Sequence, residues 1–119
     1  MSSSKFAVYL MIIKIQYMNR IVKERLNDII KLCENHGVKS LYVFGSANTD
    51  KFDKNSDVDL LISFKENLTI EEYTENYFIL QYKLRELLKR DIDLVTQNSL
   101  SNPFFIQSID QNKQLLYGA

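Results

Sequence analysis

The stretch GSANTDKFDKNSDVDL, residues 45–60, decides the fold of this chain and indicates its chemistry. It separates two β-prone runs, SLYVF at residues 40–44 and VDLLISF at residues 58–64. A Gly-Ser pair follows the first run, and an Asp-x-Asp pattern opens the second. Because side chains alternate faces along a strand, Asp57 and Asp59 are expected on one face, about 6–7 Å apart. Two such carboxylates repel each other, and a hard divalent cation would compensate their charge.

A third acid, Asp93, stands alone in the apolar run IDLVT at residues 92–96. Three carboxylates on adjacent strands suffice for Mg²⁺, which completes its coordination with water and substrate phosphates. Gly45 and Ser46 would let backbone amides and one hydroxyl approach a phosphate at the start of a helical turn. An anion site that faces a cation site predicts phosphoryl or nucleotidyl transfer assisted by two Mg²⁺ ions.

Helical and β-prone segments alternate along the chain, which predicts an α/β arrangement. Apolar residues at helical spacing predict the first helix, and the Thr69-x-x-Glu72 pattern of a capping box begins the second. The predicted elements are a helix over residues 20–35, strands over residues 40–44, 58–64 and 92–96, a helix from residue 69 to residues 89–90, a short helix over residues 102–110 and a closing strand over residues 114–117.

Composition restricts the class of protein. With 119 residues and 45% hydrophobic content, the chain has room for one domain with one core. Fifteen basic and fifteen acidic side chains give a formal charge of zero, which disfavours direct binding to nucleic acid or to an anionic membrane. The single cysteine, Cys33, cannot form an internal disulfide. We therefore expect a protein of the reducing cytoplasm.

The first 17 residues form a separate question. Their apolar run FAVYLMII, residues 6–13, is followed by Lys14 and is far shorter than the roughly 20 residues that cross a bilayer. Met18 stands directly before the first predicted helix. We therefore expect residues 1–17 to be an N-terminal extension or the product of an upstream start, and residues 18–119 to form the domain.

The deciding stretch resembles the signature of the polymerase-beta-like nucleotidyltransferase superfamily in its minimal form: Gly-Ser, ten residues, then Asp-x-Asp. Residues 45–59 fit that spacing without a gap. The resemblance covers residues 21–117 and implies a short mixed sheet flanked by helices. It also implies catalytic metal ligands and a triphosphate-binding pair: Asp57, Asp59 and Asp93 as the ligands, and Gly45 and Ser46 at the nucleotide.

The family resemblance implies transfer of a nucleoside monophosphate, AMP from ATP, to a hydroxyl acceptor. A chain of this length has no room for a domain that recognises the acceptor, so another polypeptide or a second copy should provide that site. The resemblance points to pairs in which such a protein accompanies a small helical HEPN partner. There it resembles the antitoxin, which adenylylates a tyrosine of a ribonuclease toxin. A homodimer that modifies a small molecule remains an alternative.

One departure from the family pattern supports another interpretation. Thr49 and Asp50 stand where many relatives carry Arg-Gly, so a cation for the phosphates is missing unless Lys51 or Lys54 replaces it. The chain could then be a catalytically weak module that neutralises or scaffolds its partner by binding alone.

Some candidate residues also have a purely structural interpretation. Asp93 could form a surface ion pair with Arg90, and Ser46 could cap the turn that follows it. We interpret Asp91 as a surface residue, because Asp93 directly precedes the aliphatic pair that follows the third acid in the family. Three tyrosines on the second helix are expected to pack inward or to form an aromatic partner surface: Tyr73, Tyr77 and Tyr82.

Overall fold

The computed structural model describes residues 5–6, 20–45 and 55–118. Its centre is a mixed four-stranded sheet in the order β3-β2-β1-β4. β1 runs antiparallel to β2 and to β4, whereas β2 and β3 are parallel. The predicted fold class is therefore confirmed. The strands are β1 (Val38–Phe44), β2 (Val58–Phe64), β3 (Ile92–Thr96) and β4 (Gln114–Gly118).

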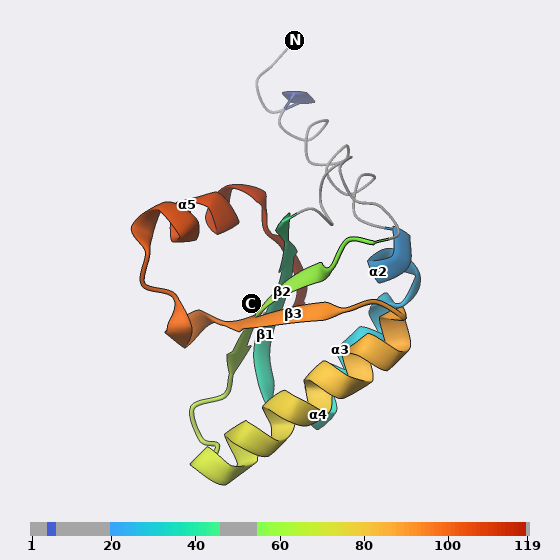
Figure 1. Cartoon of the computed structure of the whole chain (residues 1–119), viewed down its shortest axis with the longest axis vertical. Helices are drawn as coiled ribbons and strands as arrows, with labels where there is room; N and C mark the ends of the chain where they lie inside the picture. Colours follow the sequence, from blue (N-terminus) through green and yellow to red (C-terminus); the bar gives the residue numbers. More distant parts are fainter. Residues whose placement is uncertain (1–4, 7–19, 46–54, 119) are drawn as a thin grey trace.

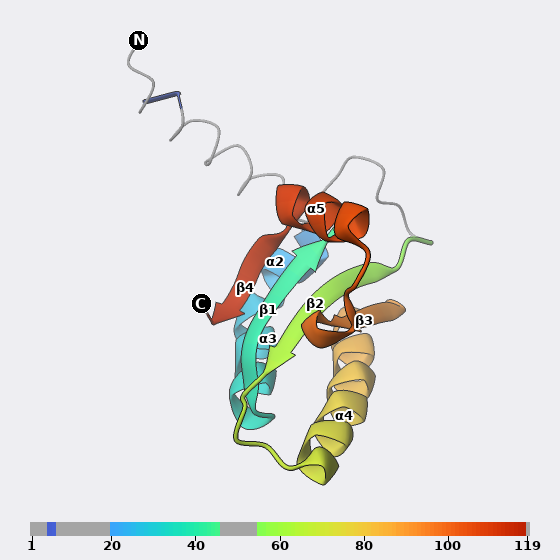
Figure 2. The same ribbon diagram turned by 90° about the vertical axis from the view of Figure 1, so that its left-hand side faces the viewer.

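Helices cover both faces of this sheet. Helices α3 and α4 lie on one face, and α5 lies on the other, beside the end of β1 (Figures 1 and 2). α4 connects the parallel strands β2 and β3. Among the described residues no helix is long and apolar enough to cross a membrane. From residue 20 onward the helices are α2 (Arg20–Glu24), α3 (Leu26–Asn35), α4 (Ile70–Leu88) and α5 (Pro103–Asn112), with a 3₁₀ turn, η2, at Gln97–Ser99.

Side chains alternate between the two faces along each strand, and apolar side chains form a core on each face of the sheet. A small cluster of Phe44, Leu61 and Ile109 holds α5 against the ends of β1 and β2. This small core positions α5 beside the predicted site. The larger cluster lies under α3 and α4, and its fully buried members include Ile29, Leu41, Val43, Val58, Leu60, Ile62, Leu80 and Leu84.

The element boundaries lie within two residues of the predictions, apart from one break inside a predicted helix. The helix predicted over residues 20–35 is interrupted at Arg25, whose N–H donates to the Val22 carbonyl three residues back at 3.2 Å. The spacing of Val22, Ile29 and Cys33 stays helical across this break, so periodicity alone does not reveal it. β1 begins two residues before the predicted strand, and α5 ends two residues beyond the predicted helix. The predicted boundary between residues 17 and 18 lies outside the described residues.

Two residues with reactive side chains have structural roles. Cys33 is buried, and burial together with Glu34 raises the pKa of its thiol to about 12. The Nδ1 of His36 donates to the Leu32 carbonyl at 2.7 Å, at the end of α3.

The aromatic residues of α4 divide between the core and the surface. Tyr73 and Tyr77 pack against the larger core, as predicted. Tyr82 and the neighbouring Phe78 are exposed by 57% and 62%. α4 therefore carries aromatic residues of both kinds: some pack in the core, and others are exposed on the surface.

α4 begins with the predicted capping box and ends in a strained residue. The Thr69 hydroxyl accepts from the Glu72 N–H at 3.1 Å, and the Glu72 carboxylate accepts from the Thr69 N–H at 3.4 Å. At the other end Lys89 has φ 55°, in the left-handed region that β-carbons disfavour. Glycine usually occupies this position after a helix.

Lys89→Gly is therefore expected to stabilise the fold. The substitution removes the left-handed strain but adds freedom to the unfolded chain, so the free energy of unfolding should rise by about 0.5–1 kcal/mol. Urea denaturation measures this difference. Lys89→Ala is the control because it removes the same side chain and keeps the strain. Equal stability of the two variants would contradict the interpretation.

Candidate active site

The parallel pairing of β2 and β3 brings two of the predicted acids side by side. Asp59 and Asp93 are direct Cα partners in the ladder, so their side chains leave the same face of the sheet. Leu61 and Val95, two residues further along each strand, belong to the small core under α5. The two acids therefore lie on the α5 face of the sheet. Asp57 precedes Asp59 by two residues and is exposed.

Asp59 responds to burial and to the charges of the two other acids. Burial, and then the charges of Asp93 and Asp57, raise the pKa of Asp59 from 3.8 to about 6. Asp59 is half-buried, whereas Asp93 and Asp57 are exposed. The site therefore concentrates negative charge around a carboxylate that is itself partly removed from water.

Gly45, directly after β1, approaches this carboxylate with its backbone. Its φ is +70°, and a β-carbon placed on it would overlap the Oδ2 of Asp59 and lie 3.2 Å from the Cγ. Phe44, the last residue of β1, is the Cα partner of Asp59. Both the left-handed conformation and the close approach require glycine here. Ser46 lies outside the described residues. So do residues 49, 50, 51 and 54, which were compared with the family pattern above.

The three carboxylates of Asp57, Asp59 and Asp93 suit a hard cation, but they are not arranged around a common point. Carboxylate oxygens are the ligands that Mg²⁺ prefers. Burial and then repulsion from Asp93 and Asp57 raise the pKa of Asp59, and a cation would relieve that repulsion. Within residues 20–45 and 55–118, however, no three His, Cys, Asp or Glu side chains are placed so that they could hold one metal ion. Binding through all three acids therefore requires their side chains to reorient.

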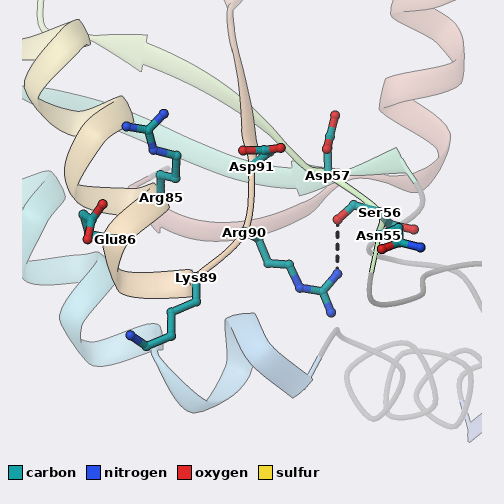
Figure 3. Close-up of a pocket in the computed structure, with 8 residues that line it drawn as sticks. All are labelled: Asn55, Ser56, Asp57, Arg85, Glu86, Lys89, Arg90 and Asp91. Atoms are coloured by element: carbon teal, nitrogen blue, oxygen red, sulfur yellow. Dashed lines mark hydrogen bonds between the residues drawn. The ribbon is translucent and has the colours of Figure 1, made fainter.

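A cavity of about 470 Å³ opens beside Asp57, between the end of α4 and the start of β2. Figure 3 shows Arg90 reaching from the end of α4 to the Ser56 carbonyl, to which it donates at 3.1 Å. The Asp91 carbonyl accepts from the Val58 N–H at 3.0 Å. Arg90 thus supports the backbone that leads into Asp57. The lining contains three cations and three acids: Arg85, Lys89, Arg90, Asp57, Glu86 and Asp91.

Two further residues bind backbone groups in or beside the site and were not singled out for it from the sequence. The Tyr77 hydroxyl donates to the Leu94 carbonyl at 2.7 Å, and burial, Asp93 and Tyr73 raise its pKa. Asn112, at the end of α5, makes two hydrogen bonds to the backbone of Gly45. Tyr77 follows the spacing of a packing residue, and Asn112 is 67 residues from its partner, so no local signal marks either of them.

The chain is similar to known proteins in sequence and in fold. The model of the nucleotidyltransferase domain family matches residues 20–116. A protein of Methanocaldococcus jannaschii, named by inference as a protein adenylyltransferase, is 35% identical over 92 residues, 76% of this chain and 90% of that protein. A crystal structure of a toxin-antitoxin with AMP-PNP superimposes with a TM-score of 0.61 and 29% identity, over 79% of this chain and 73% of the other.

A second solved structure is that of a tri-AMPylated HEPN toxin of Shewanella oneidensis in complex with its MNT antitoxin. It matches with a TM-score of 0.55 and 26% identity, over 82% of this chain and 72% of the other. The fold and the family match define a nucleotidyltransferase. The chain belongs to the nucleotidyltransferase domain family. It is also similar to a solved minimal nucleotidyltransferase, with a TM-score of 0.62 and 27% identity over 78% of this chain and 90% of the other.

Proposed function

We propose that this chain transfers AMP from Mg²⁺-ATP to a tyrosine hydroxyl of a small helical HEPN-type partner, and that it acts as the antitoxin of that pair. Two observations carry the proposal: Asp59 pairs with Asp93, and the Gly45 backbone closely approaches Asp59. Together they place acidic ligands beside a backbone that a phosphate can approach. The single cysteine suits a reducing compartment, so we assign this activity to the cytoplasm.

In this proposal Asp57, Asp59 and Asp93 hold two Mg²⁺ ions, and Gly45 and Ser46 bind the triphosphate. Bound Mg²⁺ would polarise the phosphates and compensate the charge of the leaving pyrophosphate. The chain itself orients the nucleotide and excludes part of the water around Asp59, which is half-buried. Its carboxylates should be ionised when they act, because only the charged form is a good metal ligand.

The acceptor is expected to approach from the β3 edge of the sheet. β3 is an edge strand, and Asp93 on it is exposed, so an incoming hydroxyl can reach this carboxylate. In the reaction the hydroxyl oxygen forms a bond to the α-phosphorus and the bond to the bridging oxygen of pyrophosphate breaks. Asp93 is the side chain best placed to accept the hydroxyl proton.

The identity of the partner rests on the structural neighbours. One neighbour holds AMP-PNP in a toxin-antitoxin, and another contains an AMPylated HEPN toxin with its MNT antitoxin. A chain of 119 residues with one sheet has no second domain for the acceptor within residues 20–45 and 55–118. A separate helical protein that brings its own tyrosine would supply the acceptor.

The position of the transferred label tests the reaction. The chain is incubated with Mg²⁺ and a helical HEPN-type partner, using ATP that carries label in either the α- or the γ-phosphate. We expect α-label, with adenosine, to appear on a partner tyrosine and pyrophosphate to be released. We expect transfer at the α-phosphorus because the proposed site has acidic metal ligands and the sequence has no kinase-type phosphate-binding loop.

Transfer of γ-label would exclude a nucleotidyltransferase reaction. If neither label moved and the complex still silenced the partner's ribonuclease activity, neutralisation by binding alone would replace this proposal. That alternative is favoured by Thr49 and Asp50, which stand where many relatives carry Arg-Gly.

A further inference from the structure

The carboxamide of Asn112 pairs with both polar backbone groups of Gly45. The Gly45 N–H donates to its Oδ1 at 3.1 Å, and its Nδ2 donates to the Gly45 carbonyl at 3.4 Å. A primary amide can satisfy one donor and one acceptor in this way. Asn112 is half-buried. The side chain of one residue thus supplies the hydrogen bonds that a neighbouring strand would normally provide.

The register of the sheet explains why a side chain takes this role. β4 pairs with β1 antiparallel, with Val43 opposite Gln114, so the same register would place Asn112 opposite Gly45. At that point the chain is in α5, and its backbone no longer belongs to the ladder. Backbone groups that lose a ladder partner need another one when they are partly buried. The Asn112 amide meets that need.

α5 holds this amide in place. Ile109, three residues earlier in α5, is buried with Phe44 and Leu61 in the small core. The Lys113 N–H donates to the Ile109 carbonyl at 2.8 Å and closes the last turn of the helix. Phe105 adds an edge-on contact with the ring of Phe44, with centroids 6.3 Å apart. The end of α5 is therefore fixed to the last residue of β1, directly before Gly45.

Gly45 in turn lies against Asp59, because a β-carbon on Gly45 would overlap the Asp59 carboxylate. We propose that Asn112 is a positioning residue for the nucleotide. It holds the Gly45 peptide next to the Asp59 carboxylate, in the position in which this peptide binds the triphosphate. This inference rests on the proposed function, since it assumes that the chain binds Mg²⁺-ATP at Gly45 and Asp59. It adds a residue from the C-terminal helix to a site otherwise made by the three strands.

The test compares Asn112→Ala with Gln111→Ala, an exposed neighbour in α5, in the full-length chain. Calorimetry gives the Kd for Mg²⁺-ATP, and amide hydrogen exchange follows the Gly45 N–H. The chain has three glycines, which simplifies the assignment of that amide signal. In Asn112→Ala we expect the Kd to rise about tenfold, because misplaced donors bind a charged phosphate less well. Exchange at Gly45 should accelerate, while Gln111→Ala changes neither quantity.

Asn112→Gln keeps the amide on a longer side chain and should recover part of the affinity. A purely structural role would lower the melting temperature of Asn112→Ala and leave its Kd for Mg²⁺-ATP within twofold of the unsubstituted chain, which would overturn the inference. If the unsubstituted chain itself bound no Mg²⁺-ATP, the proposed function would fail first. The Gly45 exchange would then still report whether Asn112 holds that peptide.

Discussion

Asp59→Asn is expected to lower AMP transfer by about 10³-fold or more, because it removes a charged ligand from the centre of the carboxylate group. The same substitution should stabilise the chain in the absence of metal. Burial and the charges of Asp93 and Asp57 raise the pKa of Asp59 to about 6, so its ionised form is unfavourable in the folded state. Activity and stability should therefore change in opposite directions.

The pH dependence of this stabilisation has a defined sign. Below about pH 4 the Asp59 carboxyl is protonated in both the folded and the unfolded chain. Between about pH 4 and pH 6 the unfolded chain loses this proton while the folded chain retains it, so the contribution of Asp59 to stability falls as pH rises. The destabilisation is complete above that window. Asparagine does not titrate, so the Asp59→Asn variant avoids this destabilisation.

Thermal unfolding in a chelating buffer at pH 4 and pH 8 measures the effect. At pH 8 the free energy of unfolding of Asp59→Asn should exceed that of the unsubstituted chain by about 1 kcal/mol, a value reduced for the partial solvent screening of the site. At pH 4 most of the difference should disappear, because the folded chain retains the proton and the unfolded chain has only partly lost it. Asp91→Asn is the matched control, since it removes an exposed acid two residues from Asp93. Retained transfer in Asp59→Asn, or equal stability at pH 8, would contradict the assignment.

Gly45→Ala is expected to lower AMP transfer by about 10²-fold, because the new methyl group displaces the Asp59 carboxylate. The effect on stability should be smaller. A side chain at φ +70° adds strain of about 1–2 kcal/mol, and the carboxylate can rotate away from the methyl group. The substitution should therefore damage the site more than the fold.

Gly37→Ala separates these two effects. Gly37 has nearly the same backbone conformation, with φ +67°, but a β-carbon there would meet the flexible end of Leu68 at 3.0 Å, away from the acids. Both alanine variants should lose similar stability in urea denaturation, and only Gly45→Ala should lose AMP transfer. Equal losses of transfer in the two variants would show that strain alone, and not the contact with Asp59, explains the requirement for glycine.

Local patterns in the sequence were sufficient to predict most elements of this fold. Strands β2 and β3 begin and end at the predicted residues, because their apolar runs are bounded by polar segments. The capping box at Thr69 begins α4 where its two reciprocal hydrogen bonds are possible. These signals act between residues a few positions apart, so the chain carries them before it folds. Family membership followed from the same stretch, through the spacing of Gly-Ser and Asp-x-Asp.

Only the tertiary structure determined how the site is assembled. The sequence predicted Asp93 as the third acid, but only the parallel register of β2 and β3 puts it directly beside Asp59. The raised pKa of Asp59 depends on that pairing and on burial. Asn112 reaches Gly45 because the small core docks α5 at the end of β1, across 67 residues of sequence. Such contacts depend on the packing of whole elements, and for that reason no local pattern of residues encodes them.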